Sequence, residues 1–207
     1  MKIISISAHP DDMELNCAGT LRKFQEQGAE IISIITVKPS SEDNPNRNLQ
    51  IVTTECNASY ALSKFERRIL DTTLHENGRP SLTCDNNTVS ALAKLIDNCD
   101  LAILPNPLDS HQDHSTTYNL AWPVVLKKAS EIWVTESFPY CRTYNGDRPN
   151  IFVDITSHFD FKMSLVKCYT SYIDDRCKDQ LIIANKWWGQ SSKGKYAEAF
   201  TLRNRQL

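Results

Sequence analysis

Apolar positions along the chain gather in short runs with two kinds of pattern. Nearly continuous runs, rich in isoleucine and leucine, cover residues 2–8 (KIISISA), 30–37 (EIISIITV) and 100–107 (DLAILPNP). Such runs are typical of strands in a sheet that is covered on both faces. Further strand candidates lie at 67–71, 131–137 and 150–156, and we expect an additional edge strand at 194–203.

Helical spacing separates these runs. The clearest case is residues 14–27, which Gly28 follows as a helix-ending residue and whose apolar positions are Leu15, Ala18, Leu21 and Phe24. Further helices are expected over 48–63, over 86–98 with an asparagine cap, from about Ser115, and over 158–176.

Strands that alternate with helices predict an α/β fold with a mostly parallel sheet. Neither a linker nor a shift in composition separates a second domain, so residues 1–207 are expected to form a single domain. The polar segment 38–46 is predicted to be a surface loop and a candidate rim for a site.

Composition narrows the class of protein. The 23 basic and 25 acidic residues give a net charge of -2, which argues against nucleic acid or an acidic membrane surface as the main partner. The seven cysteines form no C-x-x-C pair and are expected to be reduced. The first residues resemble neither a signal peptide nor a membrane span, so we expect a cytoplasmic protein.

Candidate chemistry lies at the ends of two predicted strands. Ligands of a parallel sheet bind beyond the carboxyl ends of its strands, and AHPDD (8–12) and PNPLDSHQDH (105–114) occupy such positions. Three of the five histidines, His9, His111 and His114, lie in these two stretches. We therefore expect the two stretches to form one site.

A divalent metal ion suits these residue types. His9 and Asp12 lie on one turn that Pro10 fixes, and His114 could supply a third ligand. Two imidazoles and a carboxylate leave a position on the metal open for water, as in catalytic zinc sites, and the metal would lower the pKa of that water towards about 7.

Three neighbouring residues then have natural roles. Asp11 could take a proton from the water. His111 could hydrogen-bond an oxyanion or protonate a leaving nitrogen, and Asp113 could orient His111 and raise its pKa.

Each feature also has a purely structural interpretation. Histidine-proline and aspartate pairs are common in turns, and Asp109 and Asp113 could cap a helix. Trp187 and Trp188 lie in a polar segment, where packing against a core edge is favoured over stacking on a sugar ring.

The motifs together resemble those of the PIG-L/LmbE-like N-acetylglucosaminyl deacetylases. AHPDD is followed by GTL at 19–21, and DSHQDH at 109–114 matches the H-x-D-H motif of the family. The likeness continues in residues 152–171 and in GKYAEAF at 194–200, so it covers nearly the whole chain.

This resemblance implies a Rossmann-like three-layer sandwich, without a nucleotide cofactor, that removes acyl groups, usually acetyl, from amino sugars and their conjugates. It implies Zn²⁺, or Fe²⁺, as the metal. The implied ligands are His9, Asp12 and His114, with Asp11 as general base and His111, assisted by Asp113, acting on the tetrahedral intermediate.

Two alternatives stay open at this point. One is a metal-dependent amidase or esterase that acts on another acylated small molecule, and the other is a non-catalytic carbohydrate-binding protein, which would not need Asp11. Partners are expected to be a small molecule or glycoconjugate, and a homo-oligomer is compatible with the sequence. A dinucleotide-dependent oxidoreductase is rejected because the first strand is not followed by G-x-G-x-x-G.

Overall fold

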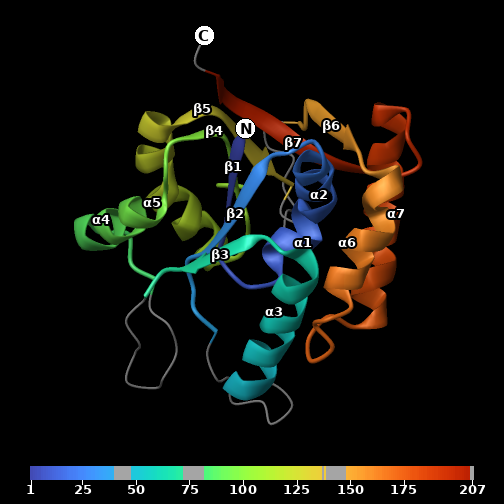
Figure 1. The fold of residues 1–207 in the computed structure, drawn as a ribbon, viewed down its shortest axis with the longest axis horizontal. Coiled ribbons are helices and arrows are strands. Elements are labelled where there is room, and N and C mark those ends of the chain that lie inside the picture. The colour runs from blue at the N-terminus through green and yellow to red at the C-terminus, as the bar shows by residue number, and fades with distance from the viewer. Residues whose placement is uncertain (40–47, 72–81, 137, 139–147, 206–207) are drawn as a thin grey trace.

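The computed structural model describes residues 1–39, 48–71, 82–136, 138 and 148–205. A seven-stranded sheet with the order β3-β2-β1-β4-β5-β7-β6 forms its centre (Figure 1). The strands are β1 Lys2–Ser7, β2 Glu30–Ile35, β3 Glu66–Ile69, β4 Cys99–Leu104, β5 Ala129–Thr135, β6 Ile151–Asp154 and β7 Ala197–Arg205. The helices are α1 Asp12–Asn16, α2 Ala18–Glu26, α3 Leu49–Ser63, α4 Asn86–Leu95, α5 Gln112–Lys128, the 3-10 helix η1 Thr156–His158, α6 Phe159–Val166 and α7 Asp175–Ser192.

The predicted α/β fold with a mostly parallel sheet is confirmed. Strands β3, β2, β1, β4 and β5 are parallel to one another, and β7 is antiparallel to both of its neighbours, β5 and β6. The expectation of an edge strand at 194–203 is wrong, because β7 lies between β5 and β6. Its residues from Ala197 to Thr201 are all buried, as an interior strand requires.

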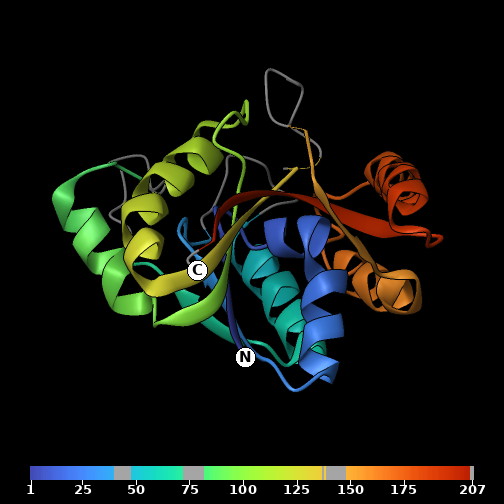
Figure 2. The same cartoon turned by 90° about the horizontal axis from the view of Figure 1, so that it is seen from above.

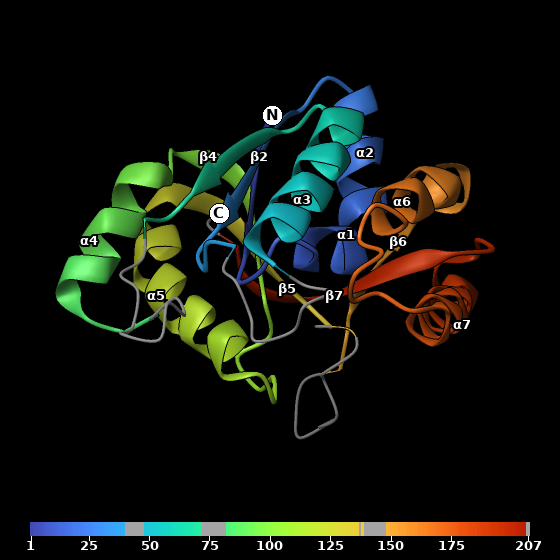
Figure 3. The ribbon, with the colours of Figure 1, turned by 90° about the horizontal axis from the view of Figure 1, so that it is seen from below.

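Side chains of alternate strand residues build two cores on opposite faces of the sheet. Ile3 and Ile103 belong to the core that α1, α2, α3 and α6 cover. Ile4 and Leu104 belong to the core under α4 and α5. The sheet therefore lies between two helical layers, which Figures 2 and 3 show from above and from below.

The helix predicted over 14–27 is broken at Cys17 into α1 and α2. The carboxylate of Glu198, from β7, accepts hydrogen bonds of 3.1 and 2.7 Å from two backbone N–H groups at the start of α2. Lys162, from α6, donates to the carbonyl of Leu15 (2.8 Å) and to Glu198 (2.6 Å). This buried ion pair satisfies the backbone groups that the break would otherwise leave without partners.

Other helix boundaries also differ from the predictions. Helix α5 begins at Gln112, three residues before the expected start. Helix α4 is capped by Asp85, which accepts from the N–H of Thr88 (2.9 Å), and not by an asparagine. The helix expected over 158–176 comprises η1 and α6 and ends at Val166.

Helix α7 was not predicted, and it carries both tryptophans of the polar segment. The ring of Trp188 lies 5.8 Å from that of Phe152 on β6, so the packing interpretation holds for Trp188. Trp187 is 62% exposed, so the packing interpretation does not hold for Trp187.

Within the described part of the chain, none of the helices has the length and hydropathy that a membrane crossing requires. Most of the loop predicted at 38–46 lies outside the described residues.

Candidate active site

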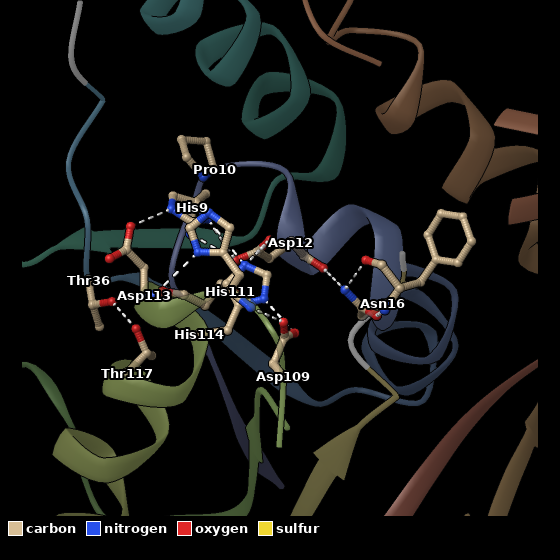
Figure 4. A network of polar contacts seen from close by, with 12 residues as sticks. His9, Pro10, Asp12, Asn16, Thr36, Asp109, His111, Asp113, His114 and Thr117 are labelled. Atoms are coloured by element: carbon tan, nitrogen blue, oxygen red, sulfur yellow. Dashed lines mark hydrogen bonds and ion pairs between the residues drawn. The ribbon is translucent and has the colours of Figure 1, made fainter. Parts of the chain in front are cut away.

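The structure brings the two predicted stretches together beyond the carboxyl ends of β1 and β4, which are neighbouring strands. Residues 9–11 follow β1, and Asp12 begins α1. Residues 105–111 follow β4, and His114 lies in the first turn of α5. In Figure 4 the side chains from the two turns point toward a common centre.

His9, Asp12 and His114 form a compact group of three possible ligands. The Nδ1 atom of His9 and the Nε2 atom of His114 are 3.2 Å apart. Oδ1 of Asp12 lies 3.2 Å from His114 Nε2, and Oδ2 lies 3.7 Å from His9 Nδ1. Ligand atoms of a tetrahedral zinc site are about 3.4 Å apart, because each lies about 2.0–2.1 Å from the metal. The donor set and its spacing therefore fit a divalent cation.

A carboxylate holds the second ring nitrogen of both histidines. Oδ2 of Asp109 lies 2.7 Å from Nδ1 of His114, and Oδ2 of Asp113 lies 3.1 Å from Nε2 of His9. Histidines that bind metals almost always donate their other N–H to a carboxylate, a carbonyl or water, which fixes the tautomer and the ring orientation. This support distinguishes the cluster from histidines and acids that meet by accident.

Sequence reasoning missed the role of Asp109, for which it offered only helix capping. The carboxyl group of Asp109 is fully buried and also accepts a 2.7 Å hydrogen bond from the backbone N–H of His111. The N-cap residue of α5 is His111, whose Nδ1 accepts from the N–H of Asp113. The available signal was an acidic residue between a buried strand and two histidines.

His111 lies in the same cluster. Its ring centroid is 4.8 Å from that of His9 and 4.9 Å from that of His114. The ligand atoms of these three histidines all lie within 4.8 Å of one another, so His111 offers a further possible ligand.

The predicted pairing of Asp113 with His111 is wrong in one respect. The carboxylate of Asp113 bonds to His9, and only its backbone N–H contacts the His111 ring (3.3 Å). The pKa of His111 is lowered and not raised, because burial and the neighbouring imidazoles His9 and His114 outweigh the charge of Asp113.

The electrostatics of the cluster favour positive charge. Burial opposes the charged form of His114, yet the carboxylates of Asp12 and Asp109 raise its pKa to about 10. Burial likewise opposes ionisation of Asp12, but His114 and His9 lower the pKa of Asp12 to about 2. A centre that stabilises extra protons on its imidazoles is one that also stabilises a cation.

The pKa of Asp11 is shifted in the opposite direction to that of its neighbour Asp12. Burial, reinforced by the charge of Asp12, raises the pKa of Asp11 to about 6. Although Asp11 is the N-cap residue of α1, its side chain forms no capping hydrogen bond, which removes the structural explanation for an acid here. A carboxylate with a pKa near 6 is suited to accepting a proton at neutral pH.

A second buried network supports the turn after β1, and sequence reasoning did not identify it. The hydroxyl of Tyr169, from the segment after α6, lies 2.7 Å from the carbonyl oxygen of Pro10 and 2.7 Å from Oε1 of Glu14. The hydroxyl of Ser59 also donates to Glu14. Burial raises the pKa of Glu14 to about 8, so this network adds little negative charge beside Asp12 at neutral pH.

Comparisons with known proteins point to one family. The model of the family described as PIG-L, GlcNAc-PI de-N-acetylase, matches residues 4–125. Solved structures also share the fold, each with less than 25% sequence identity, and three of them are described below. N,N'-diacetylchitobiose deacetylase from Pyrococcus horikoshii has a TM-score of 0.78 and 20% identity over 98% of this chain and 83% of its own.

The other two structures are similar over almost their full lengths. The 4-carboxy-2-hydroxymuconate hydratase GalB from Pseudomonas putida KT2440 has a TM-score of 0.77 and 14% identity, covering 100% of this chain and 97% of its own. Teicoplanin deacetylase Orf2, described as a zinc-inhibited form, has a TM-score of 0.69 and 16% identity, covering 99% of each chain. Because deacetylases and a hydratase share this fold, the fold alone does not decide the reaction.

Proposed function

Because this chain belongs to the PIG-L family, we propose that it is a metal-dependent hydrolase that removes an N-acetyl group from an amino sugar or its conjugate. The observation that carries the proposal is the group of His9, Asp12 and His114, in which a carboxylate orients each imidazole. A non-catalytic sugar-binding protein would not need Asp11, whose carboxylate makes no helix-capping hydrogen bond, beside this group.

The metal is proposed to be zinc or ferrous iron, held by His9, Asp12 and His114. When bound, the ion supplies Lewis-acid polarisation of the substrate carbonyl and makes water acidic enough to act as a nucleophile. One structurally similar deacetylase is described as zinc-inhibited, so both metals belong in any test. No nucleotide cofactor enters the proposal.

Asp11 is proposed as the general base. Its pKa of about 6 leaves it ionised at neutral pH and basic enough to take a proton from the attacking water. The same group can then deliver that proton to the leaving nitrogen, so that acetate and a free amine are the products.

His111 is proposed to stabilise the oxyanion. Its Nδ1 accepts from the backbone N–H of Asp113, so the neutral ring carries its proton on Nε2. Its lowered pKa keeps the ring neutral at pH 7, and Nε2–H is then a fixed hydrogen-bond donor. Asp113 is proposed to position two rings: its backbone N–H contacts His111, and its carboxylate contacts His9.

The whole chain is proposed to form one catalytic domain, although the family match ends at residue 125. Strands β5, β7 and β6 complete the same sheet as β1 and β4. Tyr169, whose hydroxyl donates to the carbonyl oxygen of Pro10 in the turn after β1, also comes from this later part.

The test is release of acetate from a panel of N-acetylglucosamine conjugates, nucleotide-linked and lipid-linked ones included, by protein loaded with zinc or iron. We expect Asp11→Asn to abolish most of the activity while metal still binds, and His111→Ala to lower kcat on the order of a hundredfold or more. Bound metal without turnover of any acylated sugar would favour the carbohydrate-binding alternative. Faster hydrolysis of other acyl compounds would favour the amidase or esterase.

A further inference from the structure

Helix α7 carries the two most exposed large apolar side chains among the residues that the structure describes. Ile183 is 66% exposed and Trp187 is 62% exposed. They are four residues apart, so they are neighbours on one face of the helix. Single exposed apolar side chains are normal, whereas adjacent ones with polar residues around them are typical of surfaces that contact another protein.

The rest of α7 holds this face outward. Leu181 and Gly189 are buried, and the side-chain amide of Asn185 donates to the carbonyl oxygen of Ala197 on β7 (2.8 Å). The ring of Trp188 packs against β6. These contacts fix one side of the helix to the sheet, and Figures 1 and 3 show α7 at the periphery of the molecule. The opposite side, with Ile183 and Trp187, is therefore free to meet a partner.

We propose that two copies of this chain associate through their α7 helices, which pack antiparallel about a twofold axis beside Ile183. In such an interface the same surface is used by both copies. Because the two helices run in opposite directions, residues at about equal distances before and after Ile183 face each other. Ile183 then meets Ile183 of the second copy, and Trp187 covers the exposed Gln180 of the second copy.

The charges beside the apolar pair favour this partner and this direction. Asp179 and Lys186 are exposed, about one turn before and one turn after Ile183. The 3.6-residue repeat places both of them on one side of Ile183 and Trp187 on the other. In the part of the chain that the structure describes, neither charge forms an ion pair.

The antiparallel arrangement pairs these charges across the interface. Asp179 of each copy faces Lys186 of the other, so two ion pairs of opposite charge form. Parallel helices would place Asp179 beside Asp179 and Lys186 beside Lys186, which is unfavourable. The helix face is thus complementary to itself in one direction only.

The strength of the dimer follows from the size of the interface. One 18-residue helix from each copy provides an interface at the small end of those found between specific partners. We therefore expect a dimer that dissociates on dilution, with a Kd in the micromolar range.

Sedimentation velocity of residues 1–207 over about 1 to 100 μM tests this, because that range spans a micromolar Kd. Ile183→Gln should raise the Kd at least about tenfold, since each dimer buries two copies of the side chain. Leu62→Gln is the matched control. Leu62 is 52% exposed on α3, outside the proposed interface, so this variant should leave the Kd unchanged.

Charge reversal tests the direction of the helices. Asp179→Lys and Lys186→Asp should each raise the Kd about tenfold, because either change places like charges together twice in every dimer. The variant with both changes exchanges the two charges and should return the Kd to near the wild-type value.

Three results would overturn the proposal. The first is a wild-type chain that is monomeric at every concentration. The second is a dimer that Ile183→Gln leaves intact, because such a dimer forms through another surface. The third is a double charge variant that associates no more tightly than the single variants, because the helices then do not pair as proposed. None of these measurements requires turnover of a substrate, so they stand apart from the proposed function.

Discussion

Replacement of Asp109 by asparagine provides the sharpest test of the proposed metal centre. Asp109 accepts two hydrogen bonds of 2.7 Å, from the ring Nδ1 of His114 and from the backbone N–H of His111. A histidine that binds metal through Nε2 must carry its proton on Nδ1. Asparagine has the same shape but only one acceptor oxygen, so one of the two donors would face an NH₂ group.

The expected loss follows from this mismatch. Removing the partner of a metal-binding histidine weakens metal affinity about 10- to 100-fold, which corresponds to about 1.4–2.8 kcal/mol. We expect a value near the upper end for Asp109→Asn, because the Asp109 carboxyl group is fully buried and no water can replace it. The matched control is Asp113→Asn. Asp113 makes a longer bond of 3.1 Å to His9 and is 26% exposed, so we expect at most about a tenfold loss.

Zinc affinity is measured by competition with a chromogenic chelator, and circular dichroism verifies that each variant is folded. The order of the two effects is the decisive result. If Asp109→Asn binds zinc within a factor of about two of the wild-type protein, the assignment of His114 as a ligand oriented by Asp109 is wrong. The same conclusion follows if Asp113→Asn weakens binding more than Asp109→Asn does.

Two further predictions concern stability, measured by urea unfolding. Lys162→Met leaves Glu198 buried without its cation and should lower the free energy of unfolding by about 3–5 kcal/mol. Arg22→Met is the control, because loss of the exposed Arg22–Glu26 pair should lower the free energy of unfolding by less than about 1 kcal/mol. Similar losses in the two variants would contradict the role of the buried pair. Burial raises the pKa of Glu136 to about 7, so its ionisation destabilises the folded state as pH rises from about 4.5 to 7. Glu136→Gln should therefore add about 1–3 kcal/mol at pH 8 and nothing at pH 4, and a gain of equal size at both pH values would refute this.

The central strands could be predicted from sequence because their environment is simple. Strands β1, β2 and β4 are buried on both faces, so runs of isoleucine and leucine mark them to within a few residues. The place of β7 depends on pairing with β5, more than sixty residues away, and no local pattern encodes that choice. Helix α7 escaped prediction because its buried residues are few, Leu181, Asn185 and Gly189, and two of them are not apolar.

The site shows the same division between local and distant causes. Two turns at the carboxyl ends of adjacent parallel strands must lie close together, which is why His9, Asp12 and His114 could be grouped from sequence. The pairing of carboxylates with imidazoles was harder to predict, because it depends on how the first turn of α5 is rotated and therefore on where the side chains of Asp113 and His114 point. Asp113 therefore reaches His9 and not His111, and Asp109 takes the position behind His114.

The sheet order explains why the site lies where it does, and contacts with later residues support the proposal that the whole chain forms one catalytic domain. From β1 the chain continues to β2 on one side, while β4 pairs on the other side, so the carboxyl ends of β1 and β4 flank the crevice where ligands bind in such sheets. The turn in this crevice is held at Pro10 by Tyr169, and the break after α1 is held by Lys162 and Glu198. All three supporting residues come after residue 125, so a chain cut there would keep the six candidate site residues and lose the groups that hold His9 and Asp12 in position.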